Sequence, residues 1–250
     1  MRLTLLLILL ITCFSAKAEG LVRIAAAADL QPALAIIEEQ FKQYYPNAQI
    51  AITYGASGTL TSQIRQGAPF QVFLSANEEN ADILIREGKT SGTGVIYALG
   101  RIAFISRLDI QADSAVEALK EWQEIKRPSD RLAIANPIHA PNGITAMSWL
   151  QHWDKTASVE STLVYGENAS QSVQFVLSGA ANSGIVAWPL IALRDDLSIN
   201  TWLIPSQEHE LASRKMVLIR NANQTAVNFY QFMQSDIAQN LLSQYGFGVP

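Results

Sequence analysis

The sequence predicts an α/β fold, and three observations lead to that prediction. Short apolar or β-branched runs alternate with longer segments of helical period along most of the chain. Hydrophobic residues make up 49% of the 250 residues and the net charge is only -4, which excludes a disordered chain. A single cysteine excludes a disulfide scaffold. The length suits one large domain or two lobes of roughly 100 residues each.

Residues 1–18 have the pattern of a secretory signal peptide. A positive start is followed by an apolar run over 3–14 and by a small-residue cleavage site at 16–18. The run of about a dozen residues is shorter than the roughly 20 that span a bilayer, which argues against a retained anchor. A threonine precedes Cys13 where lipid attachment favours Gly or Ala, so a lipoprotein is the weaker alternative. We therefore expect a thiol-free mature chain in the periplasm, starting at Glu19.

The strands and helices of the mature chain are expected in alternation. Runs rich in β-branched or apolar residues predict strands over 21–27, 49–54, 71–74, 101–106, 131–135, 162–165, 184–187, 201–204 and 215–220. Helical periodicity predicts helices over 30–44, 59–66, 78–87, 144–153, 171–178, 225–234 and 236–245. Because no long linker or internal repeat interrupts this order, we expect a compact chain from residue 19 onward.

Four strand-to-helix turns share small or short polar residues, at 27–29, 55–58, 142–143 and 167–170. In open α/β sheets, ligands collect at such turns, outside the carboxyl ends of the strands. Each turn directs backbone N–H groups, at the positive end of a helix dipole, into the space above the sheet. Four turns facing one another would form a cage of uncharged donors for a small oxyanion. The same residues are also good helix caps, so the pattern by itself leaves the function open.

Five segments carry a resemblance to a known family: IAAAADLQPAL, YGASGTLTSQIRQGAPFQVFLSA, RLAIANPIHAPNGITA, GENASQSVQFVLSGAANSGIVA and the terminal YGFGVP. Together they resemble the periplasmic molybdate-binding proteins of ABC transporters, over nearly the whole mature chain. The resemblance implies a two-lobed periplasmic binding protein fold of class II type. Each lobe would be a mixed sheet flanked by helices, with the ligand in the interlobe cleft. Residues 19–98 with 214–250 would form lobe 1 and residues 99–213 lobe 2, with crossovers near 99–106 and 213–220.

The resemblance also implies the substrate-binding residues, which match Ala28, Ser57, Asn142 and Ala169. Ser57 would bind through its hydroxyl and its N–H, and the other three through backbone N–H groups. The side-chain amide of Asn142 is a further candidate donor. A fifth family position, a tyrosine in well-known members, is Ala187 here and is followed by Trp188. Because Ala28 and Ala187 replace hydroxyl donors of the family, the identity of the oxyanion stays open.

Asp29 lies beside the first of these positions and has two interpretations. As the N-cap of the helix that begins at Leu30, it would accept hydrogen bonds from the first N–H groups of that helix. Facing the ligand, its carboxylate would repel a dianion and would favour a protonated anion such as hydrogen phosphate. The cap is the favoured interpretation, and with it molybdate is the first choice of ligand.

The function implied by the resemblance is a solute-binding protein that is not an enzyme. It would capture molybdate and tungstate as a monomer, without a cofactor or a metal-cation site, and deliver them to a membrane permease. Another small oxyanion, such as hydrogen phosphate or sulfate, is the alternative, and an exported hydrolase is a distant one. A hydrolase is disfavoured because no G-x-S-x-G motif is present.

Other functional classes also find little support in the sequence. The GKTSGTG stretch at 88–94 lacks the spacing of a phosphate-binding loop. The adjacent residues 208–210, Glu-His-Glu, cannot all face one metal ion. Nucleic-acid binding is excluded because the 18 basic residues are scattered and are outnumbered by 22 acidic ones.

Overall fold

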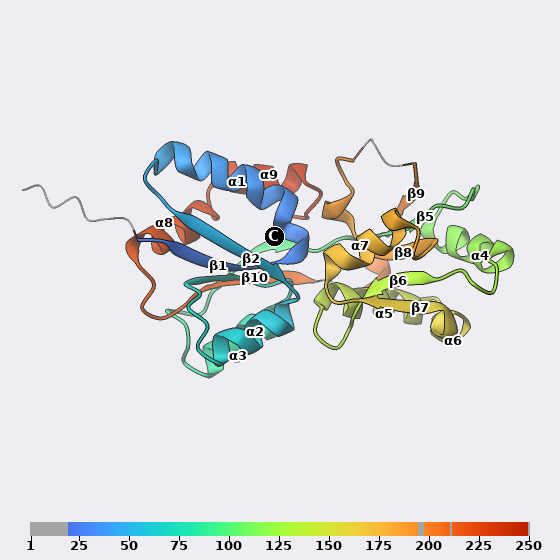
Figure 1. The fold of residues 1–250 in the computed structure, drawn as a ribbon, viewed down its shortest axis with the longest axis horizontal. Helices are drawn as coiled ribbons and strands as arrows, with labels where there is room; N and C mark the ends of the chain where they lie inside the picture. The colour runs from blue at the N-terminus through green and yellow to red at the C-terminus, as the bar shows by residue number, and fades with distance from the viewer. Residues whose placement is uncertain (1–19, 195–197, 211, 250) are drawn as a thin grey trace, which may run out of the picture.

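The computed structural model describes residues 20–194, 198–210 and 212–249. The predicted signal peptide lies outside these residues. The described strands form two sheets of five, in the orders β2-β1-β3-β10-β4 and β7-β6-β8-β5-β9. The sheets lie side by side along the long axis of the molecule (Figure 1), and we call the parts built on them lobe 1 and lobe 2. The predicted two-lobed α/β fold is therefore confirmed.

The strands of lobe 1 are β1 (Val22–Ala27), β2 (Ile50–Gly55), β3 (Val72–Leu74), β4 (Val95–Leu99) and β10 (Ser213–Leu218). Its helices are the 3-10 turn η1 (Ala28–Leu30), α1 (Gln31–Tyr44), α2 (Ser57–Arg65), α3 (Glu78–Arg86), α8 (Gln224–Phe232) and α9 (Asp236–Gln244). The strands of lobe 2 are β5 (Ile102–Ser106), β6 (Leu132–Ala135), β7 (Leu163–Gly166), β8 (Ser183–Ala187) and β9 (Asn200–Leu203). Its helices are α4 (Ala115–Ile125), α5 (Pro141–His152), α6 (Thr156–Val159), η2 (Glu160–Thr162), α7 (Ala169–Ser178), η3 (Trp188–Leu190) and η4 (Ser206–Glu208).

The sheet of lobe 1 is centred on β1 and β3. Strand β1 pairs in parallel with β2 on one side and β3 on the other, and places Ile24 opposite Ile52 and Val72. Most of β1 is buried, as expected for a nearly continuous apolar run, whereas β2 at the sheet edge is partly exposed. Strand β10 runs antiparallel to β3 and β4. Parallel β1, β2 and β3 therefore bring the turns that follow them to one end of the sheet.

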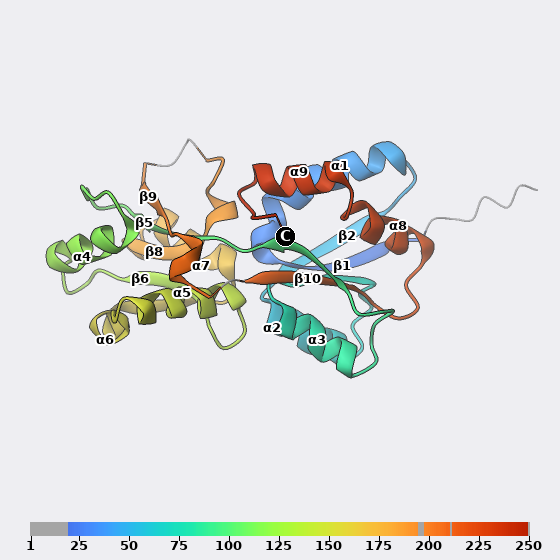
Figure 2. The same cartoon turned by 180° about the vertical axis from the view of Figure 1, so that it is seen from behind.

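Helices cover both faces of each sheet. In lobe 1, α1, α8 and α9 lie on one face and α2 and α3 on the other (Figures 1 and 2). Their apolar sides form two core clusters, one around Phe41 and the other around Phe73. Lobe 2 has a cluster around Trp149 beneath α4 and α5 and a second around Val176 of α7. Each sheet is therefore held between two apolar layers, which gives the turns at its end a rigid support.

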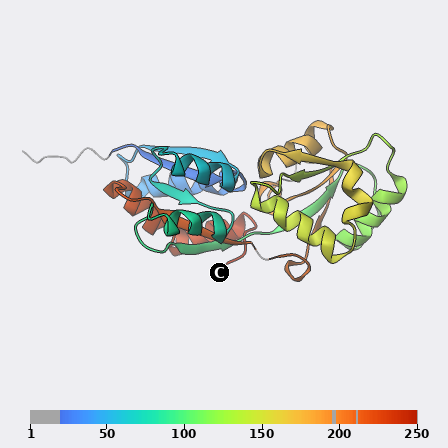
Figure 3. The same ribbon diagram turned by 90° about the horizontal axis from the view of Figure 1, so that it is seen from below.

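Two crossing segments join the lobes. The chain leaves lobe 1 between β4 and β5 and returns between β9 and β10. The N–H of Gly100 in the first segment donates to the carbonyl of Ala212 in the second, at 2.8 Å. Figure 3 shows the lobes side by side with these crossing segments between them. No helix of the described residues is long and apolar enough to span a membrane.

Besides short 3-10 turns, the strand β4 and the helices α4 and α6 were not predicted from the sequence. Strand β4 follows a turn that is rich in glycine, and its five residues give only a short apolar signal. The sequence contains a signal for the start of α4, namely the Ser-x-x-Glu pattern at 114–117. In the structure the hydroxyl of Ser114 accepts from the N–H of Glu117 at 3.3 Å and donates to its carboxylate at 3.0 Å. The two residues have the spacing of a capping box, although the Glu117 carboxylate accepts from the Ser114 hydroxyl and not from the Ser114 N–H. A helical pattern that buries Leu119 and Trp122 follows.

Candidate functional site

A small cavity lies between the lobes, where the four predicted strand-to-helix turns meet the turn that follows β3. It is narrow, with only about 10 Å³ open to the centre of a water molecule, and it is lined by Ala27, Ala28, Gly55, Ala56, Ser57, Ala76, Ala140, Pro141, Asn142 and Ala169. Lobe 1 contributes the residues after β1, β2 and β3, and lobe 2 contributes the starts of α5 and α7. The structure therefore brings together the four candidate substrate-binding residues of the sequence, two from each lobe. None of the residues that line this cavity is charged.

The helices that begin at this cavity mostly lack a side-chain cap. Helix α2 begins after Ala56 and α5 after Ala140, and neither alanine can accept a hydrogen bond through its side chain. In α7 the side chain of Asn168 accepts from the N–H of Gln171 at 3.1 Å, which leaves the first two N–H groups uncapped. The first N–H groups of a helix have no partner within the helix. These helix starts therefore offer backbone donors to the cavity.

Ser57 is the one cavity residue with a hydroxyl. Its side chain is buried, and its Oγ accepts a hydrogen bond from the N–H of Ala76 at 2.9 Å. A hydroxyl that accepts one bond still has its own proton to donate. The contact with Ala76 therefore fixes the Oγ of Ser57 and leaves its O–H available for a ligand.

The lobes are in direct contact around the cavity. The N–H of Gly58 in lobe 1 donates to the carbonyl of His139 in lobe 2 at 2.9 Å. The hydroxyl of Ser170 in lobe 2 donates to the carbonyl of Ala28 in lobe 1 at 3.1 Å. A Cβ atom added to Gly58 would lie only 2.9 Å from the carbonyl oxygen of His139. The structure is thus a closed arrangement, and glycine at position 58 is what allows the two turns to approach.

Asp29 is fully buried and forms an ion pair with Arg214. Nη1 of Arg214 donates to Oδ1 of Asp29 at 3.0 Å, Nη2 donates to Oδ2, and Nδ2 of Asn142 donates to Oδ2 at 2.9 Å. Neither η1 nor α1 has a side-chain cap in the described structure, so the prediction that Asp29 caps this helix is wrong. A bidentate guanidinium is a stronger partner for a buried carboxylate than a helix N–H. Asp29 is also not among the residues that line the cavity.

Arg214 was not recognised as a site residue from the sequence. The register of β10 shifts between Arg214 and Lys215, and such a bulge re-aims the side chain. The guanidinium lies 4.9 Å from the ring centre of Phe247. Burial opposes its charge, but Asp29 and Tyr97 outweigh burial, so the pKa of Arg214 is raised. A single arginine at a buried position of an apolar strand is the signal that could have revealed it, because such a residue needs a partner.

Ala187 and Trp188 do not line the cavity. Ala187 ends β8, where it is buried opposite Ile102 of β5. Trp188 begins η3, and a Cβ atom added to Gly246 would lie 2.5 Å from its Cδ1. Trp188 of lobe 2 therefore packs against the C-terminal segment of lobe 1 at Gly246. The structure separates these two candidates from the other four.

Comparisons with known proteins agree with this architecture. Residues 22–248 match the model of the family described as bacterial extracellular solute-binding protein. The chain belongs to this family. It is 30% identical to the molybdate-binding protein ModA of Azotobacter vinelandii, over 96% of this chain and 94% of that relative. It is 28% identical to the molybdate-binding protein ModA of Rhodobacter capsulatus, over 79% of this chain and 77% of that relative.

Solved structures of other binding proteins share the fold of this solute-binding protein. The periplasmic molybdate-binding protein of Azotobacter vinelandii matches with a TM-score of 0.81 and 25% identity, covering 92% of this chain and 99% of that one. The sulfate-binding protein SubI of Mycobacterium tuberculosis matches with a TM-score of 0.71 at 15% identity, covering 91% and 86%. The second likeness concerns the fold alone.

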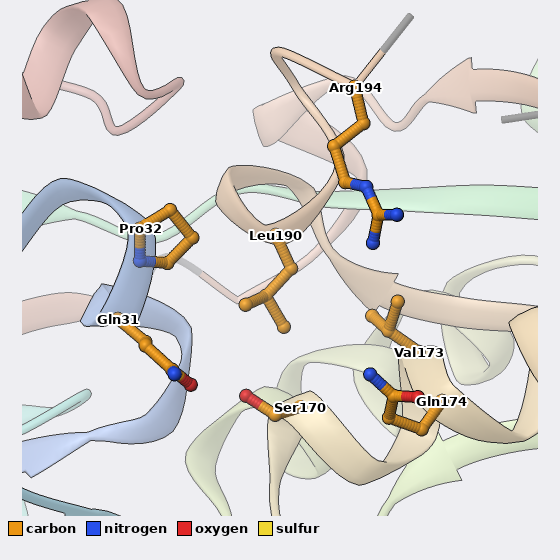
Figure 4. A pocket seen from close by; sticks show the side chains of 7 residues that line it. All are labelled: Gln31, Pro32, Ser170, Val173, Gln174, Leu190 and Arg194. Carbon is orange, nitrogen blue, oxygen red and sulfur yellow. The ribbon is translucent and has the colours of Figure 1, made fainter. Parts of the chain in front are cut away.

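A second hollow of this solute-binding protein lies between the start of α1 on one side and α7, η3 and Arg194 on the other. Gln31 and Pro32 of lobe 1 lie across from Ser170, Gln174 and Leu190 of lobe 2 (Figure 4). This groove is wider, with about 190 Å³ open to the centre of a water molecule, so it is too large to contact a small ion on all sides. No cluster of His, Cys, Asp and Glu among the described residues is suited to a metal cation. The small cavity is therefore the better candidate for the site.

Proposed function

We propose that this solute-binding protein captures molybdate, and also tungstate, in the periplasm and delivers it to the membrane permease of an ABC importer. The observation that carries the proposal is the set of uncapped helix starts around a small, uncharged cavity. The relatives that are named molybdate-binding proteins support the choice of ion. Residues 1–18, as a signal peptide, would export the chain.

A tetrahedral oxyanion would satisfy the donors that this cavity leaves without partners. The N–H groups of Ala28, Ser57, Asn142 and Ala169 and the hydroxyl of Ser57 would donate to its oxygens. The positive ends of the helix dipoles favour the negative charge of the ion. The ion would therefore take the place of the missing helix caps, and neutral donors held by two rigid sheets would bind it without a cationic side chain.

The charge state of the ion follows from the lining of the cavity. Hydrogen phosphate carries a proton that needs an acceptor, but the lining has no carboxylate and Asp29 is engaged by Arg214. A cavity of donors therefore favours fully deprotonated ions such as molybdate, tungstate and sulfate. Sulfate has the same charge but is smaller than molybdate, so a rigid cage that fits molybdate would hold sulfate less tightly.

Capture and delivery would use the two-lobed arrangement. We place lobe 1 at residues 19–98 with 214–250 and lobe 2 at 99–213. An ion held first by one lobe would draw the second lobe onto it, because the donors of both lobes bind the same ion. The permease would then recognise the closed form, as expected for a ligand that shifts a two-state equilibrium.

Thermal unfolding of the mature, ligand-free protein tests this proposal. Molybdate, tungstate, sulfate and hydrogen phosphate would each be added at about 1 mM. A ligand with a micromolar Kd contributes about 4 kcal/mol at that concentration, which raises the Tm by on the order of ten degrees. We expect that shift with molybdate and tungstate and a much smaller one with sulfate. A comparable shift with hydrogen phosphate, or no shift with any of the four ions, would overturn the proposal.

A further inference from the structure

We propose that the side chain of Asn142 is a latch that holds the lobes closed by binding the buried Asp29–Arg214 pair. The backbone N–H of Asn142 faces the ion in the proposed function, whereas its side-chain amide has this separate, positioning role. The inference deepens the proposed function, because a latch matters only if closure retains the ligand.

The amide of Asn142 contacts both members of the ion pair. Its Nδ2 donates to Oδ2 of Asp29 at 2.9 Å, and its Oδ1 accepts from Nη2 of Arg214 at 3.4 Å. Asn142 belongs to the first turn of α5 in lobe 2, whereas Asp29 follows β1 and Arg214 lies on β10, both in lobe 1. An amide carries a donor and an acceptor in one group, so it matches a carboxylate and a guanidinium together.

Burial makes these contacts strong in the closed form. The exposed fractions of Asp29, Arg214 and Asn142 are 0%, 0% and 7%. Hydrogen bonds to ionised groups are stronger than neutral ones, and they strengthen further when water is excluded. Because the partners lie on different lobes, separating the lobes must break these bonds. The latch therefore stabilises the closed state and not the open one.

The cluster of Asn142, Asp29 and Arg214 has no net charge, so it does not repel a dianion in the neighbouring cavity. The charges of Asp29 and Arg214 cancel. Among the described residues, Tyr97 of β4 is the other titratable group that interacts with the pair, and burial raises its pKa above the ordinary value. Tyr97 therefore stays neutral at physiological pH, with its hydroxyl donating to the carbonyl of Ser75 at 2.9 Å. Because both pKa values are raised, neither Tyr97 nor Arg214 changes charge between pH 6 and 8.

The variant Asn142→Asp tests the latch, because it replaces the donor by a carboxylate of nearly the same shape beside Asp29. Two carboxylates at this distance do not both ionise readily, so closure would take up a proton. As the pH rises from 6 to 8, we expect the molybdate affinity of Asn142→Asp to fall by up to about tenfold per pH unit. This is the slope expected when closure takes up one proton. The wild-type affinity should stay nearly constant over that range.

The exchange variant Asp29→Asn/Asn142→Asp provides the rescue. It moves the carboxylate to lobe 2 and the amide to lobe 1, so the donor–acceptor match and one negative charge beside Arg214 are restored. We expect most of the affinity to return and the pH dependence to disappear. The control is Asn223→Asp on α8, where the side chain accepts from the N–H of Ala226 at 2.9 Å. Asp and Asn cap helices equally well, so this control should show no pH dependence.

A measurement without ligand separates the latch from the proposed function. Spin labels on cysteines introduced at the exposed positions Gln63 of α2 and Gln151 of α5 would report the distance between the lobes. We expect Asn142→Asp to be more open at pH 8 than at pH 6, and the wild type to be the same at both. Failure of the wild type to bind molybdate would reject the proposed function alone. Identical pH profiles and distances in wild type and Asn142→Asp, or no recovery in the exchange variant, would overturn the latch.

Discussion

Helices that begin at the interlobe cavity and helices that begin elsewhere satisfy their first N–H groups differently. Away from the cavity, α4, α8 and α9 each start after an asparagine or serine whose side chain accepts a backbone hydrogen bond, whereas the short α6 has no side-chain cap. Helix α3, which begins just after the cavity residue Ala76, is capped by Asn77. At the cavity, α2 and α5 start after an alanine. A side-chain cap contributes about 1 kcal/mol to stability. The starts of α2 and α5 therefore fit the proposed function, in which an ion accepts from their first N–H groups.

Helix α7 combines a side-chain cap with a start at the cavity. Its N-cap residue Asn168 satisfies the N–H of Gln171, one turn into the helix, while the N–H groups of Ala169 and Ser170 come first. Its start thus has a stabilising cap and still presents two donors, and Ala169 lines the cavity. Capping and ligand binding are therefore compatible when they use different N–H groups of the same turn.

The donors of both lobes reach the cavity only when the lobes are closed, and Gly58→Val should prevent this closure. The Cβ atom would lie 2.9 Å from the carbonyl oxygen of His139 and 3.1 Å from its Cα, so the lobes would have to separate. We expect molybdate affinity to fall by about 100-fold or more, which corresponds to about 3 kcal/mol. Isothermal titration measures it, with the neighbouring Thr59→Val as control. Wild-type affinity in Gly58→Val would mean that the closed arrangement is not the binding form.

Removal of the Ser57 hydroxyl should have the next largest effect on molybdate affinity. Ser57→Ala removes a donor to a charged ligand, and such a bond is worth about 1.5–3 kcal/mol. We expect molybdate affinity to fall by tenfold or somewhat more, measured by titration calorimetry. The control is Ser62→Ala on the exposed face of the same helix, where the hydroxyl donates to the carbonyl of Gly58 at 3.0 Å. Equal affinities for the two variants would show that the buried hydroxyl takes no part in binding.

A cap added at the cavity should act in opposite directions on stability and on binding. In Ala56→Ser the new hydroxyl accepts from the N–H of Gly58 or Thr59 in the first turn of α2, and because position 56 lines the cavity it also takes up space that the ion needs. We expect the ligand-free protein to gain up to about 1 kcal/mol of unfolding free energy and its molybdate affinity to drop several-fold. Urea unfolding and titration of the same sample measure both quantities. A rise in both would contradict the idea that the ion takes the place of a cap.

A cap removed away from the cavity should leave binding unchanged. Asn223→Ala deletes the bond to the N–H of Ala226 at the start of α8. We expect a loss of about 1 kcal/mol in the free energy of unfolding, with molybdate affinity the same as in the wild type. Urea unfolding and titration provide the test, and a change in affinity would show that the two groups of helices are not independent.

The parts of the site that the sequence predicts are local. The four turns at 27–29, 55–58, 142–143 and 167–170 are rich in small or short polar residues and precede helices, so the local pattern reveals the turns. The choice of Ala28, Ser57, Asn142 and Ala169 within them came from the resemblance. The α/β alternation is local in the same sense, since each strand and helix depends on its own periodicity. The resemblance supplied the remaining information, namely that the four turns meet.

The ion pair behind the cavity is not local, and the sequence analysis missed it. Asp29 and Arg214 are separated by 185 positions, and a bulge between Arg214 and Lys215 accompanies the inward position of the arginine. Asp29 followed by a helix has the pattern of a cap, and nothing near it in the sequence indicates a guanidinium. The choice between cap and ion pair depends on tertiary structure, which overrides a local preference.

The backbone amides of the cavity provide the most direct test. In ¹⁵N-labelled protein titrated with molybdate, binding by uncapped helix starts predicts downfield shifts for the amide protons of Ser57, Asn142 and Ala169. The amides at the capped start of α8, Gln224 and Thr225, should not move. Saturable binding of molybdate that leaves the three cavity amides unshifted, or that moves both groups equally, would contradict the claim that these helix starts hold the ion.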